Sequence, residues 1–181
     1  MNKSTDTRNV LDEFKGWEHD AIVRELDVRG TGLEIAIENT ERDFNMGTIV
    51  RSANGFGVRY IHVIGRKQWN KRGAMATDKY LNVLYYASVD DFVIEMKKRD
   101  KTIIAIDNIS DSKPLSKTTL SKNAVLVFGQ EGPGVSQELA RASEKIVAIE
   151  QFGSTRSINV GVAAGIAMYA WLQQNALKEN T

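Results

Sequence analysis

Short apolar runs alternate along this chain with segments in which apolar residues recur at helical spacing. The apolar runs predict strands at 33–37, 58–64, 102–106, 124–128 and 145–149. The spaced segments predict helices at 8–27, 46–53, 89–96, 135–142 and 157–174. Strands that alternate with helices pair in parallel and are covered on both faces. The expected fold is therefore α/β, with a mostly parallel sheet flanked by helices.

The composition removes several classes of protein. The chain of 181 residues suits one domain, and it has no cysteine, which excludes disulfide scaffolds, thiol nucleophiles and cysteine-ligated metals. His19 and His62 are the only histidines, so no metal site is expected. The net charge is +1, so binding to a nucleic acid would depend on a local basic patch.

Nothing in the sequence indicates export or a membrane span. The first residues lack the apolar stretch of a signal peptide. The longest run of low polarity, 160–172, has 13 residues, whereas a bilayer requires about 20. Together with the absence of cysteine, these features favour the cytoplasm.

Polar and glycine-rich segments follow three predicted strands, at 38–47, 129–134 and 150–159. Ligands of parallel sheets bind beyond the carboxyl ends of the strands, so we expect these segments to converge. The first runs Asn45-Met-Gly47-Thr-Ile-Val-Arg51, with Asn45 placed to cap a helix and Arg51 on its polar side. A capped amphipathic helix with a solvated arginine is the simpler alternative.

The second segment is Gly129-Gln-Glu131-Gly132-Pro-Gly134, a strand-to-helix turn with three glycines and one carboxylate. Glycine lets a ligand approach the backbone closely. The turn is neither a Walker loop nor a dinucleotide fingerprint, because the required residues are missing. A tight connection without a ligand remains the alternative.

The third segment leads into an unusual helix, for which Ser157 is the expected N-cap. No residue from Ser157 to Gln174 is charged, and Gly161 and Gly165 lie four positions apart. A helix that is apolar nearly all round must be covered nearly all round. We therefore expect a homodimer built on this helix, with a central helix of a monomer as the alternative.

Taken together, the three segments resemble the SPOUT class of RNA methyltransferases, specifically its TrmH-like ribose 2′-O-methyltransferases. The family pattern is Asn-x-Gly-x-x-x-Arg, then Gly-x-Glu-x-x-Gly after a strand, then Ser-x-Asn-Val before a helix. It matches Asn45–Arg51, Gly129–Gly134 and Ser157–Val160, in this order. The resemblance covers roughly residues 33–174.

The resemblance implies a deep trefoil knot in the C-terminal part, a homodimer, and S-adenosyl-L-methionine as cofactor. The implied catalytic cluster is Asn45, Arg51, Glu131, Ser157 and Asn159. The implied cofactor contacts are Phe128, Gly129, Gly134, Ile149, Gln151, Ile158, Asn159 and Ala163. Because a guanidinium keeps its proton below about pH 12, we expect Arg51 to position an RNA phosphate and stabilise developing alkoxide.

A basic segment offers a surface for RNA. From Arg59 to Asn82 there are six basic residues and one acidic residue, a net charge of +5, with Trp69 and Tyr80 as possible stacking surfaces. The expected RNA contacts are Arg59, Arg66, Lys67, Trp69, Lys71 and Arg72. A solvated loop with Trp69 packed on the domain is the alternative.

The expected organisation is an N-terminal helical extension at 1–31, a methyltransferase domain at 32–176 and a tail at 177–181. The extension has five bases and seven acids, so it is a poor phosphate binder. The chain departs from many relatives because the segment before Leu33 is too short for a large separate RNA-binding domain. The resemblance to compact relatives that act on transfer RNA therefore implies transfer RNA slightly more than ribosomal RNA as substrate. A knotted RNA-binding protein without turnover and a nucleotide-binding α/β module are the competing functions.

Overall fold

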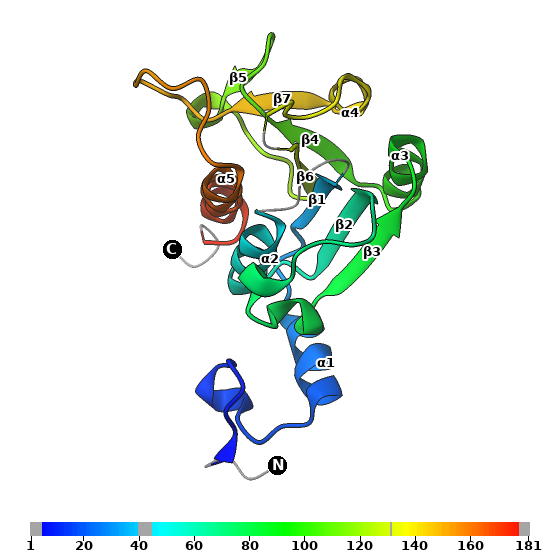
Figure 1. Cartoon of the computed structure of the whole chain (residues 1–181), viewed down its shortest axis with the longest axis vertical. Helices are drawn as coiled ribbons and strands as arrows, with labels where there is room; N and C mark the ends of the chain where they lie inside the picture. The colour runs from blue at the N-terminus through cyan, green and yellow to red at the C-terminus, as the bar shows by residue number, and fades with distance from the viewer. Residues whose placement is uncertain (1–4, 40–44, 131, 178–181) are drawn as a thin grey trace.

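A computed structural model describes residues 5–39, 45–130 and 132–177 of the chain. Its seven strands form one sheet in the order β3-β2-β1-β6-β4-β7-β5, and every strand pair between neighbours is parallel (Figure 1). The strands are β1 (Glu34–Asn39), β2 (Tyr60–Gly65), β3 (Asn82–Tyr86), β4 (Thr102–Ile106), β5 (Lys113–Pro114), β6 (Ala124–Phe128) and β7 (Lys145–Ala148). The predicted mostly parallel α/β sheet is confirmed.

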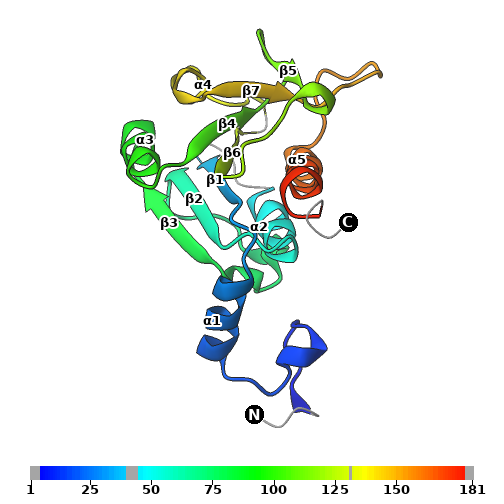
Figure 2. The same cartoon turned by 180° about the vertical axis from the view of Figure 1, so that it is seen from behind.

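Helices cover both faces of this sheet (Figures 1 and 2). The covering helices are α2 (Met46–Gly55), α3 (Val89–Lys98), α4 (Gln137–Ala142) and α5 (Val160–Asn175), whereas α1 (His19–Arg29) precedes the sheet. Short 3-10 helices among the described residues are η2 (Asp12–Phe14), η3 (Arg72–Ala74), η4 (Thr77–Tyr80) and η5 (Leu115–Lys117). Helices α2 and α5 share one hydrophobic cluster with the sheet, and α3 and α4 share the other.

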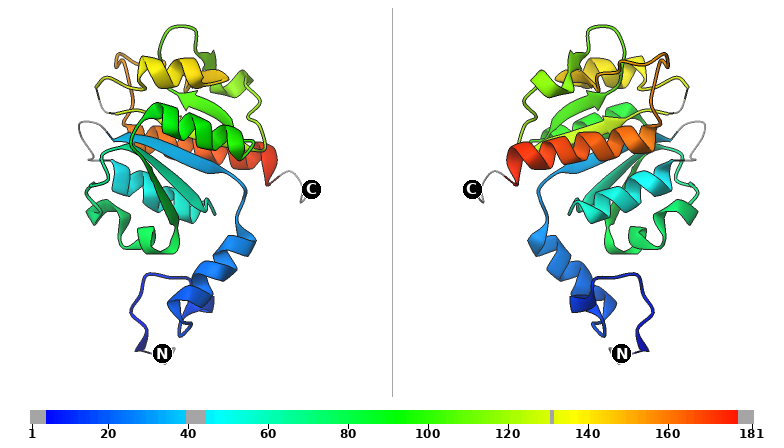
Figure 3. Two further views of the ribbon diagram at one scale, coloured as in Figure 1. Left: turned by 90° about the vertical axis from the view of Figure 1, so that its right-hand side faces the viewer. Right: turned by 90° about the vertical axis from the view of Figure 1, so that its left-hand side faces the viewer.

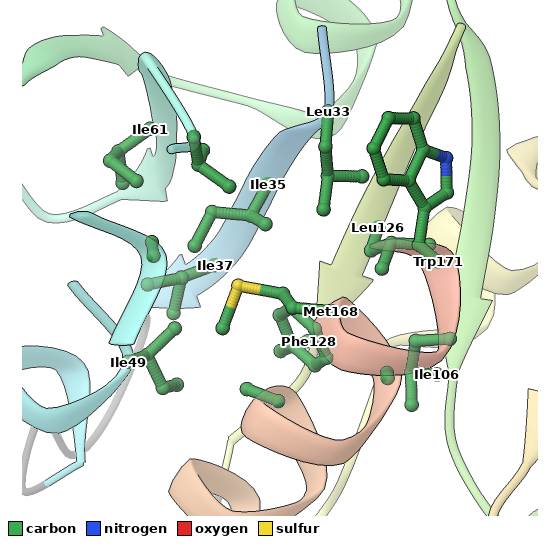
Figure 4. Packing of buried hydrophobic residues seen from close by; sticks show 14 of the residues in the cluster. Leu33, Ile35, Ile37, Ile49, Ile61, Ile106, Leu126, Phe128, Met168 and Trp171 are labelled. Atoms are coloured by element: carbon green, nitrogen blue, oxygen red, sulfur yellow. The ribbon is translucent and has the colours of Figure 1, made fainter. Parts of the chain in front are cut away.

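The larger cluster lies between the sheet and the pair α2 and α5 (Figure 4). Ile35 and Ile37 of β1 point into it, whereas Ala36 between them points to the opposite face, as the alternation of a strand requires. Met168 and Trp171 of α5 are fully buried there. The Trp171 indole Nε1 donates to the Ser121 carbonyl at 2.8 Å, so the polar atom of this ring is satisfied.

The N-terminal segment differs from its prediction. A single helix over 8–27 is wrong, because the chain forms η2, turns at Gly16 with φ of 84°, and only then begins α1. Phe14 and Ile22 pack with Tyr80 of η4 in a small separate cluster. This N-terminal unit extends away from the sheet (Figure 3).

Two strands were not expected from the sequence. Strand β3 lies at one edge of the sheet and begins where the basic segment ends, at Asn82, and β5 has only two residues at the other edge. The predicted N-cap of the last helix is also wrong. Asn159, not Ser157, caps α5, because its Oδ1 accepts from the backbone N–H groups of Gly161 at 2.9 Å and Val162 at 3.2 Å.

Helix α5 is buried on one side and open on the other. Gly161, Ala164, Ala167 and Met168 are buried against the protein. The opposite side exposes Val162, Ile166 and Tyr169 by 55%, 41% and 48%. No helix among the described residues is both long and apolar enough to span a membrane.

Candidate active site

The segments that follow β4, β6 and β7 meet beside the start of α5 and enclose a cavity of about 410 Å³. All of these strands contribute their carboxyl ends, which is where a parallel sheet binds ligands. The lining residues are Ile106, Asp107, Asn108, Gly129, Gln130, Gly132, Gly134, Ile149, Gln151, Ser157, Ile158, Asn159, Val160 and Ala163.

The turn after β6 is shaped by glycine. Gln130 and Gly134 exchange two backbone hydrogen bonds of 3.1 Å, which fold the turn back on itself. A Cβ on Gly129 would collide with backbone atoms of Gly134 and Val135, and Gly134 has φ of 73°. The turn therefore depends on glycine at both positions. Glu131, predicted to be catalytic, lies outside the described residues.

Asp107 holds this turn against the end of β4. One carboxylate oxygen accepts from the backbone N–H of Val135 at 2.7 Å, and the other accepts from that of Asn108 at 2.7 Å. Sequence reasoning missed Asp107 because a single aspartate after a strand matches no motif. The signal that could have found it is its position, directly after an apolar run and level with the two predicted loops.

The first and third motifs meet through two amide side chains. Asn159 Nδ2 donates to Asn45 Oδ1 at 3.0 Å, across 114 positions of sequence. Asn45 occupies the predicted N-cap position of α2, but its side chain accepts no cap hydrogen bond from that helix. Room for this contact comes from Gly161, where a Cβ would lie 3.1 Å from Asn159 Oδ1 and 3.2 Å from Thr48 Cγ2. The pair connects α2 to the wall of the cavity.

Arg51 lies on α2, the helix that begins at this amide pair and runs beside α5. Its side chain is exposed, and it forms no ion pair with any residue in the described ranges. The structure thus leaves a guanidinium on the helix that Asn45 and Asn159 connect to the cavity. An exposed cation in this position suits an anionic substrate.

The cavity has the character of a binding site for a polar organic molecule. Ile149, Ile158 and Ala163 supply an apolar wall, while the turn after β6 supplies backbone groups. Gln151 Oε1 is buried and has no hydrogen-bond partner within the described part of the chain. A buried acceptor without a partner is costly, so it favours a ligand that donates a hydrogen bond at this point.

The family model that describes the SpoU rRNA methylase family matches residues 32–169. The chain belongs to this family. The match includes all three motifs, and the resemblance drawn from the sequence is confirmed. The prediction of an RNA methyltransferase is confirmed with it.

Similar proteins in this family carry related names. The chain is 29% identical over 157 residues to the tRNA (guanosine(18)-2′-O)-methyltransferase of Aquifex aeolicus, covering 84% of this chain and 74% of that protein. It is 26% identical to the protein of the same name from Escherichia coli K12, covering 84% of this chain and 70% of that protein. The A. aeolicus TrmH/SpoU tRNA-modifying enzyme has a similar structure, with a TM-score of 0.77 at 27% identity over 89% of this chain and 84% of that one.

A further similar structure contains bound AdoMet. It is the AdoMet-bound rRNA methyltransferase from Sinorhizobium meliloti, which matches with a TM-score of 0.70 at 26% identity. The match covers 78% of this chain and 56% of that one.

Eight of the predicted catalytic and cofactor residues line the cavity of this SpoU-family chain. Among the predicted cofactor contacts Phe128 does not, because its side chain is fully buried in the core cluster. The predicted cofactor residues that do line it are Gly129, Gly134, Ile149, Gln151, Ile158, Asn159 and Ala163. Ser157 and Asn159 of the predicted catalytic cluster line it as well.

Two of the predicted RNA contacts are wrong. Arg59 is buried, with Nε donating to Asp27 at 2.8 Å and a terminal nitrogen to the Tyr80 carbonyl at 2.6 Å, so it anchors α1 and η4. Trp69 is only 8% exposed and packs in the core, so its ring offers no stacking surface. Tyr80, the second expected stacking surface, is also buried.

The other predicted RNA contacts lie on the surface of the segment that precedes and forms η3. Arg66, Lys67, Lys71 and Arg72 are all exposed. Lys71 pairs with Asp78 at 2.9 Å and lies over the Trp69 ring at 5.4 Å. A Cβ on Gly47 would lie 2.7 Å from the Ala74 N, so η3 contacts the first turn of α2 directly. The basic surface therefore adjoins the helix that carries Arg51.

Proposed function

We propose that this chain transfers a methyl group from S-adenosyl-L-methionine to a ribose 2′-hydroxyl of a transfer RNA. The observation that carries the proposal is the hydrogen bond between Asn45 and Asn159 at the cavity wall. It joins a helix bearing an exposed arginine to a cavity suited to a polar organic cofactor. These are the two parts that methyl transfer to an RNA hydroxyl requires.

The cavity fits the cofactor by its donors, acceptors and shape. When bound, S-adenosyl-L-methionine supplies a methyl group on a good leaving group, so the reaction needs no metal. The apolar side chains of Ile149, Ile158 and Ala163 suit the flat adenine ring. The unpartnered Gln151 Oε1 and the backbone of the turn after β6 suit the polar groups of the nucleoside and of the amino acid.

Arg51 is assigned to the substrate side of the reaction. Its guanidinium binds an RNA phosphate in bidentate fashion and stabilises negative charge that develops on the ribose oxygen. Ser157 and Asn159 orient the ribose and the cofactor against each other, and Asn45 fixes Asn159. Glu131 is proposed as a catalytic residue because of its place in the second motif. A phosphate or a water accepts the hydroxyl proton, because arginine is no base near neutral pH.

The names of the relatives and the exposed basic residues support tRNA as substrate. Arg66, Lys67, Lys71 and Arg72 form a cationic surface beside α2. Transfer RNA recognition by such a surface would be strongly dependent on salt. The chain would act in the cytoplasm.

The exposed side of α5 is proposed as a homodimer interface. Val162, Ile166 and Tyr169 form an apolar stripe there, and Tyr169 lies 6.2 Å from the Phe56 ring of α2. A stripe of this kind is unusual on a helix that is otherwise buried. The partner copy would complete the RNA-binding side of the site. Sedimentation of Tyr169→Glu against wild type tests this, with a shift to monomer as the expected result.

We also propose that the C-terminal segment forms the trefoil knot and that the domain boundaries fall at residues 31 and 176. Strand β7 inserts between β4 and β5, which are consecutive in sequence. Helix α5 contacts the segment after η5, because Gln174 Oε1 accepts a hydrogen bond from the Leu120 N–H at 2.8 Å. Pulling the chain from its termini tests the knot, which would hold the unfolded contour shorter than its length permits.

The activity is tested with the full chain, tritiated S-adenosyl-L-methionine and unmodified tRNA transcripts. The expected result is a label at one ribose, shown by resistance of the adjoining phosphodiester to alkaline hydrolysis. Label on a base would overturn the ribose assignment. Binding of tRNA and cofactor without any transfer would favour the alternative of a knotted RNA-binding protein.

A further inference from the structure

The loop between β7 and α5 projects from the carboxyl edge of the sheet (Figures 1 and 3). Gln151 and Ser157 of this loop line the cavity, and the residues between them are exposed. Ser157 is itself exposed at the cavity mouth. The loop therefore presents its side chains to solvent at the cavity mouth. A molecule that binds these side chains would lie next to the cavity proposed for the cofactor.

Phe152 at the start of this loop is 98% exposed. Exposed large apolar residues elsewhere in the described ranges lie at lower values, with Val28 at 83% and Leu11 at 65% in the N-terminal unit. The ring gains nothing from the fold of its own chain, because an exposed aromatic loses the stabilisation that burial provides. Because the Phe152 ring lies beside the cavity, we expect a molecule other than this chain to cover it.

Arg156 supplies a cation on the same loop. Its backbone carbonyl accepts from Asn108 Nδ2 at 3.4 Å, which fixes the end of the loop to the cavity wall, while its side chain is exposed. No acidic residue occurs from 151 to 157. An exposed aromatic ring and an exposed guanidinium on one loop are the pair of groups that binds a nucleobase and its phosphate.

We propose that Phe152 is a stacking platform for a nucleobase of the RNA substrate, and that Arg156 binds a phosphate next to that base. The inference rests on the proposed function, because it names the substrate contact of the same site. It replaces Trp69, which is buried, as the aromatic that meets RNA.

The composition of the loop favours RNA over a second copy of the chain as the occupant. The other exposed residues from 152 to 157 are Gly153, Ser154, Thr155, Arg156 and Ser157, so Phe152 has no apolar neighbour among them. The core of a protein interface needs several contiguous apolar residues, which the stripe on α5 provides and this loop does not. A single ring among small polar residues suits the face of one base.

The test measures binding of a fluorescein-labelled, unmodified tRNA transcript to the full chain by anisotropy. Phe152→Ala is expected to weaken binding about 5- to 100-fold, the range for loss of one stacked base. Phe152→Tyr restores binding because it keeps the ring, whereas Phe152→Leu does not, because an aliphatic side chain cannot stack. Arg156→Gln lowers the slope of log affinity against log salt by about 0.7 to 0.9.

Matched controls separate this role from others. Val28→Ala removes another highly exposed apolar side chain, in the N-terminal unit, and is expected to bind tRNA as wild type does. Cofactor affinity by calorimetry stays unchanged in Phe152→Ala. Unchanged tRNA binding in Phe152→Ala, or restoration by Phe152→Leu, would overturn the inference. So would dissociation of the dimer, which would assign the ring to a second copy.

The outcome also separates this inference from the proposed function. If wild type methylates tRNA while Phe152→Ala binds tRNA normally, the stacking role fails and the activity stands. If wild type transfers no methyl group but needs Phe152 to bind tRNA, the activity fails and the platform stands.

Discussion

The polar side chains at the two ends of the sheet differ in whether they have hydrogen-bond or ion-pair partners. At the amino end, Glu34 accepts from His62 at 2.7 Å, from Arg99 at 2.7 Å and from Lys101 at 2.9 Å. At the carboxyl end, Gln151 Oε1 has no partner among the described residues, and Arg51, on the helix that begins there, is exposed and forms no ion pair with them. The closed network stabilises the fold, whereas the open end keeps groups available for ligands.

The largest expected effect comes from replacing Arg51, which forms no ion pair within the described ranges. Arg51→Ala should lower single-turnover methyl transfer about 100- to 1000-fold, the loss typical for one group that stabilises transition-state charge. Arg51→Lys should recover only a small part, because lysine lacks the bidentate fork. Cofactor affinity should not change in either variant. Nearly full activity in Arg51→Lys would contradict bidentate positioning.

The glycine turn provides the next test at this end of the sheet. Gly129→Ala should weaken binding of S-adenosyl-L-methionine about 10- to 100-fold, because its Cβ would collide with the backbone of Gly134. Gly55→Ala is the matched control, since a Cβ there meets nothing within 4 Å. Calorimetry on both variants measures the difference. Equal affinities would mean that the turn does not shape the cofactor site.

The sequence predicted the closed parts of this molecule better than the open ones. Strands such as 124–128 were predicted within a residue, because burial on both faces leaves an uninterrupted apolar run. Strand β3 was missed because it lies at an edge, half exposed, and follows a basic segment. Strand β5 has two residues and exists only through its pairing with β7, which no local pattern encodes.

The candidate site was predictable as motifs but not as contacts. The three motifs indicated which loops converge, and the cavity contains two of them directly. The role of Asp107 in holding the turn depends on Val135, 28 positions away, so its place after an apolar run could indicate the site but not this contact. Charge counting failed for Arg59, because its partner Asp27 lies on the N-terminal helix. Net charge along a segment does not report which cations the fold neutralises.

At the amino end, breaking the network should affect stability and leave the site intact. Glu34→Gln leaves three cationic or donor groups facing a neutral amide in a buried position. Losing one partner of a buried pair costs roughly 3 kcal/mol, so the free energy of unfolding in urea should fall by about 2–4 kcal/mol. Cofactor affinity at low temperature should match wild type. A large loss of affinity would mean that the two ends are coupled.

The smallest expected effect is a pH dependence of stability that originates in this same network. Burial lowers the pKa of His62 below its ordinary value, so the folded ring stays neutral, with its nitrogens facing Glu34 and the Tyr86 hydroxyl. Burial acts to raise the pKa of Glu34, but the hydrogen bonds from His62 and Lys101 outweigh it, and the pKa is lowered.

Both shifts have the same sign for stability. Below about pH 6.5 the unfolded chain binds a proton at His62 that the folded chain does not, so the free energy of unfolding falls as the pH falls. Glu34 adds a further loss at still lower pH, where the unfolded carboxylate is protonated first. Above pH 7 neither group changes its charge, so the thermal midpoint should be level there.

Below pH 6.5 the midpoint should decrease by up to about 3–5 °C per pH unit, from one extra proton bound on unfolding. His62→Gln keeps a hydrogen-bonding side chain without a titratable ring. Its thermal midpoint should be lower than that of wild type at pH 7 but should change less between pH 6.5 and pH 5. Calorimetric scans of both proteins measure the slopes. Equal slopes would place the acid sensitivity outside this network, and the closed end of the sheet would then be stabilised by packing rather than by its charges.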